Sequence, residues 1–264
     1  MDVKMKKVYF LFLTTMACVG CSSGNNAIDP SEPILGAPDT DFSANPEVLT
    51  LPPEFPAQSE TATYRVAIFN DWGVEDFPQD FPDDAHLSAI AGATHNEAVS
   101  FYQFGEVASF GIISIAESGV NDTFIEDDVT AGIQLGTVDS AIVHPERTGP
   151  RIDGRSGIQT FDIVMRRSWP LFTFATKLSP SPDWFVGLTG MPLYQTDTGW
   201  RDQIQTTLPM MDGGSRSAVT PMNGGPNETP LEPISFVFYD PATGSYVTGE
   251  RPSFVARLAM TRIQ

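Results

Sequence analysis

The chain has 264 residues, of which 33 are acidic and 15 are lysine or arginine, so its formal net charge is −18 at pH 7. A protein this acidic repels nucleic acids and anionic membrane surfaces before contact, which excludes both as direct partners. Its two cysteines are Cys18 and Cys21, so the chain beyond them contains no disulfide bond.

The first 21 residues have the features of an export signal. Three lysines precede a mostly apolar run over residues 8–19, which is too short to cross a bilayer comfortably as a mature helix. The run ends in Cys18-Val19-Gly20-Cys21, where small residues precede a cysteine as in bacterial lipoprotein processing sites. We therefore expect residues 1–21 to be a lipoprotein signal that ends at lipidated Cys21. The alternatives are an ordinary signal cut near Gly20, which leaves Cys21 free, or a retained anchor.

A lipidated Cys21 would tether the chain to the bacterial outer membrane, at its periplasmic face or at the cell surface. Residues 22–61 are rich in Pro, Ser, Asn, Asp and Glu and have no sustained periodicity, so we expect a disordered linker. A linker of this composition holds a domain roughly 35 Å from its anchor on average. The remaining residues, 62–264, suffice for one domain with a sizeable core.

Most of this domain has the pattern of β-strands. Alternating apolar and polar residues, separated by Pro and Gly clusters, predict strands over Tyr64–Asn70, Phe161–Arg166, Leu171–Leu178, Trp184–Leu188, Ile234–Tyr239 and Phe254–Ile263. Two further segments have a helical pattern, Glu106–Glu117 and Phe124–Leu135, and each contains one glycine that weakens it. The domain is therefore expected to be mainly β.

Two motifs of the domain resemble the motif pair of the spondin N-terminal domain family. The first reads Ser181-Pro182-Asp183-Trp184-Phe185-Val186-Gly187, and the second begins Asp212-Gly213-Gly214. Other blocks match the family in order, among them Tyr64-Arg65-Val66-Ala67-Ile68-Phe69-Asn70 and Gly92-Ala93-Thr94-His95-Asn96. The resemblance covers about residues 62 to 264. It implies a C2-like antiparallel β-sandwich of about eight strands with one or two short helices, and a role in adhesion and ligand recognition.

The resemblance also implies a calcium site where the loops of the sandwich meet. Asp183 and Asp212 correspond to family ligands, and Asp162 is the nearest match to a third, after a shift of one residue. Arg216 stands where the family loop carries another aspartate. Its guanidinium would weaken calcium binding, or fill the site by pairing with Asp183 and Asp212. We expect Ca²⁺ to bind weakly or not at all.

Two alternatives to a binding module remain open. One is a metal-dependent hydrolytic enzyme that uses His86 and His95, which have aspartates nearby. The nine-residue spacing of these histidines is not that of a pair on one helix face, and the chain has no His-Glu-x-x-His motif, so we assign no catalytic residue. The other alternative is a structural lipoprotein of the cell envelope.

An apolar group near the ion loop is the candidate binding surface. It consists of Met210, Met211 and Trp200. The function expected from the sequence is a non-catalytic, membrane-tethered, extracytoplasmic binding or adhesion module. It would act as a monomer, touch the membrane only through its lipid, and bind an extracellular or envelope protein or a glycan.

Overall fold

The computed structural model describes residues 55–145, 149, 157–217, 219–222 and 224–264. The predicted signal, Cys21 and most of the predicted linker therefore lie outside the described residues. No helix among the described residues is long and apolar enough to span a membrane.

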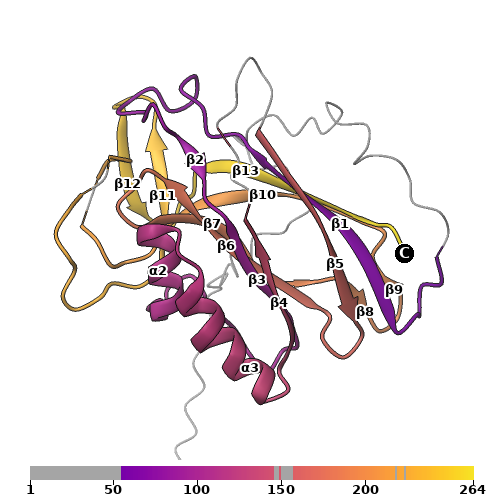
Figure 1. Ribbon diagram of the computed structural model, residues 1–264. Helices are drawn as coiled ribbons and strands as arrows, with labels where there is room; N and C mark the ends of the chain where they lie inside the picture. Colours follow the sequence, from indigo (N-terminus) through magenta and orange to yellow (C-terminus); the bar gives the residue numbers. More distant parts are fainter. Residues whose placement is uncertain (1–54, 146–148, 150–156, 218, 223) are drawn as a thin grey trace, which may run out of the picture. The chain divides into compact units, whose positions relative to one another are not determined.

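Antiparallel strands make up most of the described chain (Figure 1). The strands are β1 (Thr61–Asn70), β2 (His86–Leu87), β3 (Ile90–His95), β4 (Val138–His144), β5 (Gly157–Arg166), β6 (Leu171–Ser179), β7 (Trp184–Pro192), β8 (Tyr194–Gln195), β9 (Gly199–Trp200), β10 (Gln203–Asp212), β11 (Ser235–Asp240), β12 (Ser245–Gly249) and β13 (Phe254–Arg262). The helical segments are α2 (Phe110–Ser118), a π-helix η2 (Phe124–Val129) and α3 (Thr130–Gln134). The expected mainly β, antiparallel fold is confirmed, with more strands than the eight expected.

One long sheet runs in the order β4-β3-β6-β7-β10-β13-β1-β5, and the β11–β12 hairpin extends from β10. The first part of β10 pairs with β13, and its last three residues pair with β7. The register shifts between Leu208 and Pro209. Pro209 has no N–H to donate to the ladder, which accounts for this irregularity, and the residues after it pair with β7. This change carries Asp212 to the start of β7.

Two layers of apolar side chains stabilise the fold. The larger core includes Trp72, Phe172 and Leu258 and is enclosed by the strands, consistent with a β-sandwich. The second core lies between the helices and the outer side chains of the sheet, such as Ala175 and Phe185. Figure 1 shows α2 on the part of the sheet formed by β6 and β7, with which it makes direct contacts. The end of α2 therefore reaches the loops that carry Asp183 and Asp212.

Candidate functional site

Asp183 lies in the turn between β6 and β7, directly before the first residue of β7. Ser181 shapes this turn, because its Oγ accepts a hydrogen bond from the backbone N–H of Trp184 at 3.1 Å. The same hydroxyl donates to the Trp184 carbonyl oxygen at 3.2 Å. Trp184 is fully buried and packs against Tyr246 with ring centroids 5.2 Å apart. The core therefore fixes the backbone from which Asp183 projects.

The Asp212 loop packs directly on this turn. The N–H of Gly213 donates to the carbonyl oxygen of Asp183 at 2.9 Å. Gly214 has a positive φ of 71°, and a Cβ at this position would come within 2.0 Å of the Glu232 carbonyl oxygen. Only glycine combines that backbone conformation with so close an approach. The Gly-Gly pair thus brings the two aspartates together, as the sequence predicted.

Asp183 is completely buried, and its two carboxylate oxygens differ sharply in their contacts. Oδ2 accepts hydrogen bonds from the N–H groups of Ser215 and Arg216, at 2.7 and 2.9 Å, and from the Ser215 hydroxyl at 3.1 Å. Oδ1 is buried and has no hydrogen-bond partner among the described residues. Burial raises the pKa of Asp183, and the hydrogen bonds to Oδ2 act in the opposite direction.

Both carboxylate oxygens of Asp212 have partners. Oδ1 accepts from the N–H of Gly214 at 2.8 Å, and Oδ2 accepts from Nε1 of Trp184 at 3.1 Å. Burial raises the pKa of Asp212 to about 7, and repulsion from Asp183 adds to this effect. The two aspartates therefore meet in a setting that disfavours two negative charges.

Lys177 places an ammonium group against the turn that carries Asp183. Lys177 is only 5% exposed to solvent. Nζ donates to the carbonyl oxygens of Ala116 and Ser181, each at 2.7 Å, and to Ser181 Oγ at 3.3 Å. Burial lowers the pKa of Lys177 to about 8, while Asp183 and Glu117 attract its charge and act in the opposite direction. Sequence reasoning missed this residue, although a lysine within the largely apolar β6 is the signal that could have identified it.

Arg216 contacts Glu117 instead of the aspartates. Its Nε and Nη2 donate to the two carboxylate oxygens of Glu117 at 3.0 and 2.9 Å. This bidentate bond lowers the pKa of Glu117 and raises that of Arg216. The expectation that the Arg216 guanidinium bridges Asp183 and Asp212 is therefore wrong. Only the backbone N–H of Arg216 bonds Asp183, because Glu117 at the end of α2 captures the side chain.

Asp162 lies elsewhere in the fold. It is on β5, four positions from β7 in the strand order, and its carboxylate pairs with Arg65 of β1 at 3.0 Å. The cross-strand register of Arg65 and Asp162 explains this pairing. The structure therefore does not bring Asp162 to Asp183 and Asp212.

The donor set around Asp183 does not fit a calcium ion. Calcium requires several oxygen ligands, usually with more than one carboxylate among them. Here Asp183 Oδ1 is the one carboxylate oxygen of the two aspartates without a hydrogen bond, and the buried ammonium of Lys177 lies nearby. Across the described ranges, no group of three or more His, Cys, Asp or Glu side chains is placed to hold a metal ion.

The histidines of the enzyme alternative lie at opposite ends of β6. His86 pairs with Ser179 and His95 with Leu171, so the backbones of these partners are separated by roughly 26 Å along the strand. His95 is buried, and its Nε2 contacts Thr173 Oγ1 at 2.7 Å. Burial also lowers its pKa. A shared reaction centre is incompatible with this separation.

The candidate apolar surface is a core feature. Met210, Met211 and Trp200 are 0%, 5% and 4% exposed. The two methionines lie on β10, where their backbones pair with β7. Trp200 packs its ring against Tyr64 and Tyr194. The expectation that these three residues form a binding surface is therefore wrong, because all three lie on strands and their side chains are buried.

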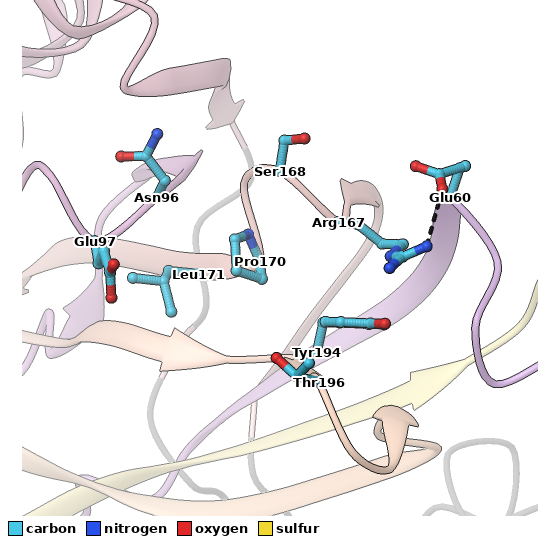
Figure 2. A pocket seen from close by; sticks show the side chains of 9 residues that line it. All are labelled: Glu60, Asn96, Glu97, Arg167, Ser168, Pro170, Leu171, Tyr194 and Thr196. Carbon is cyan, nitrogen blue, oxygen red and sulfur yellow. Dashed lines mark hydrogen bonds and ion pairs between the residues drawn. The ribbon is translucent and has the colours of Figure 1, made fainter.

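A polar groove of about 590 Å³ lies at the other end of β6. It is lined by Glu60, Asn96, Glu97, Arg167, Ser168, Pro170, Leu171, Tyr194 and Thr196 (Figure 2). These residues come from the position just before β1, the loop after β3, the β5–β6 turn with the first residue of β6, and the β8–β9 hairpin. The sequence did not reveal the groove, because its residues converge from four separate segments.

One wall of the groove is held in place by charge and ring contacts. Arg167 Nη1 donates to Glu60 at 2.9 Å, and its guanidinium lies 5.1 Å from the centre of the Tyr194 ring (Figure 2). The Tyr194 hydroxyl bonds Gln58, and its ring packs edge-on against buried Trp200. These contacts hold Tyr194 in place on its buried side, and the residue remains partly exposed to solvent.

Comparisons with known proteins agree on one family. Residues 62–243 match the family model described as Spondin_N. Over 213 residues the chain is 30% identical to Spondin-1 of Gallus gallus and of Homo sapiens, which covers 77% of this chain and 26% and 25% of those proteins. It is 28% identical to Spondin-2 of Homo sapiens over 162 residues, or 60% of this chain and 47% of that protein. The chain thus spans less than half the length of these curated relatives.

Proposed function

The chain belongs to the spondin N-terminal domain family, and from this premise we propose that it is a non-catalytic, extracytoplasmic binding module tethered to a membrane. The observation that carries the proposal is the continuous family match from β1 to the β11–β12 turn. The distance between His86 and His95 favours binding over the hydrolytic alternative.

We propose the groove of Figure 2 as the surface that meets the partner, and a glycan as that partner. Its lining offers carboxylates, an amide, hydroxyls and a guanidinium around the partly exposed Tyr194. Sugar hydroxyl groups both donate and accept hydrogen bonds, so a mixed lining of this kind satisfies them. A volume of about 590 Å³ lies within the range of small-molecule sites, so the groove can hold a few sugar units.

Glu97 is the groove residue best suited to a test, because it is exposed and lies in the loop after β3. Glu97→Arg should weaken binding of the full-length protein to envelope polysaccharide at least tenfold, measured by pull-down and then by calorimetry with the bound fragment. Glu75→Arg makes the same charge change at an exposed residue outside the groove and should leave binding unchanged. Envelope binding that resists Glu97→Arg and is lost after protease treatment of the envelope would contradict a glycan partner.

The membrane tether rests on the Cys18-Val19-Gly20-Cys21 segment. We expect a clickable palmitate analogue supplied to an expressing bacterium to label the wild-type protein. Cys21→Ser should abolish the label and release the protein from the membrane fraction. Cys18→Ser, a matched change three residues earlier, should keep both label and membrane association. A labelled Cys21→Ser protein would mean that the anchor is attached elsewhere.

The structural-lipoprotein alternative makes a different prediction. A structural component would stay bound to peptidoglycan or to another envelope protein whatever the state of the groove. Loss of envelope binding in Glu97→Arg but not in Glu75→Arg therefore separates the two functions.

A further inference from the structure

The charge balance around Asp183 includes two cations that belong to the protein. Three acidic side chains gather there, namely Glu117, Asp183 and Asp212, and Arg216 pairs directly with the first of them. This leaves two buried aspartates and the buried Lys177. Buried charges are costly unless opposite charges or hydrogen bonds compensate them. Lys177 attracts the charge of Asp183 from the neighbouring Ser181, to which its ammonium is bonded, without a direct hydrogen bond to the Asp183 carboxylate.

The contacts of Lys177 join three elements at one point. Its ammonium has three donors, and the structure gives it three acceptors: the Ala116 carbonyl of α2, the Ser181 carbonyl and the Ser181 hydroxyl. Lys177 itself belongs to β6. A hard metal ion in such a place would likewise bind backbone carbonyls and join neighbouring loops. The ammonium thus has both the charge and the carbonyl contacts of a bound cation.

The sequence gives Lys177 a special position as well. It is the only lysine beyond residue 7, and every other basic residue of the domain apart from histidine is arginine. An arginine could not take its place, because a planar guanidinium is larger and holds its donors in a fixed fork. A single compact ammonium in an otherwise lysine-free domain indicates that this site requires that group.

We propose that Lys177 is the resident cation of this site: its ammonium replaces a metal ion beside Asp183 and joins α2, β6 and the turn before β7, so that the domain is assembled without calcium. The inference is independent of the partner, because it concerns the loops at the Asp183 end of β6 and not the groove at the other end.

Thermal unfolding of the full-length protein in detergent tests the proposal, followed by tryptophan fluorescence, to which Trp184 contributes along with three other tryptophans. For the wild type, Tm in EDTA and in millimolar CaCl2 should agree within about 1 °C, and calorimetry with CaCl2 should show no binding below millimolar concentration. Lys177→Met keeps the length of the apolar stem and removes the charge. Its Tm should fall in EDTA and should rise by about 5 °C with CaCl2, because the uncompensated carboxylates then attract the ion.

Arg216→Met is the matched control, because it removes a cation that pairs outside the buried pair of aspartates. It should remain insensitive to CaCl2. Lys177→Arg keeps the charge but not the shape, and should be destabilised without gaining a calcium response. Submicromolar calcium binding by the wild type would overturn the proposal, and so would a Lys177→Met protein whose stability matches the wild type in EDTA. If Lys177→Met does not fold, calorimetry of the wild type still tests the proposal, because submicromolar calcium binding would contradict it.

Discussion

Asp212 makes the stability of the domain sensitive to pH. Its pKa is raised from 3.8 to about 7, so the folded state holds a proton that the unfolded state has lost between these values. The stability that the protonated Asp212 side chain contributes is fully present below about pH 4 and is lost as the pH rises through 7. We expect the free energy of unfolding to fall by up to about 4 kcal/mol over this interval, measured by urea unfolding at several pH values.

Asp212→Asn should flatten this pH profile. Below about pH 4 it should also lower stability by about 1–2 kcal/mol, because Gly214 and Trp184 both donate to Asp212 and an amide offers only one acceptor oxygen. Asp162→Asn, at an exposed ion pair, should keep the slope of the wild type. An unchanged slope in Asp212→Asn would assign the pH dependence to another group.

At the residue scale, the proximity of Asp183 and Asp212 could be predicted because a family motif pair carries both. The roles of Lys177 and Glu117 could not, because their contacts join residues far apart in sequence: Lys177 reaches Ala116, and Glu117 reaches Arg216. The sequence shows the type of each side chain but not the neighbour that it meets. The position of Arg216 suggested a contact with the aspartates, and the geometry of α2 directs it to Glu117 instead.

At the scale of the elements, α2 positions both Ala116 and Glu117, and Ser109 fixes its start. Ser109 Oγ accepts from the N–H of Ile112 at 3.2 Å and donates to Asp128 at 2.7 Å. We expect Ser109→Ala to cost about 1–2 kcal/mol of stability, because the helix loses its N-cap and Asp128 loses a donor. Ser118→Ala, in the last turn, removes two exposed hydrogen bonds, one donated to the Ser114 carbonyl and one accepted from the Val120 N–H, and should cost less than Ser109→Ala. If urea unfolding shows that both variants lose the same free energy of unfolding, Ser109 does not act as a stabilising N-cap of α2.

The elements themselves were predictable to different degrees. The six strands with alternating patterns and both helical segments are present in the structure, although α2 begins at Phe110 instead of Glu106. The strand β3 was not predicted as such, because all six of its residues are buried and nothing alternates. β10 was missed for another reason. It contains Pro209 and changes partner there, so its pattern indicates a loop.

At the scale of the whole molecule, the sheet depends on its last strand in sequence, β13. The family match ends at residue 243, but β13 (Phe254–Arg262) lies beyond it and pairs with both β1 and β10. Val255, Ala256 and Leu258 belong to the larger core and are fully buried. A chain that ends at residue 243 would expose two strand edges and one side of this core at the same time.

We expect the chain truncated after residue 243 to lose cooperative unfolding altogether. Removing a central strand costs more than the roughly 5–15 kcal/mol of net stability that holds a typical domain together. Circular dichroism during heating should show a sigmoidal transition for the full chain and none for the truncated one. Inserting two glycines at Thr243, in the β11–β12 turn, leaves β13 in place and should preserve the transition with a small fall in Tm. A cooperative transition in the truncated chain would show that the matched segment is a complete folding unit and that β13 is an addition to it.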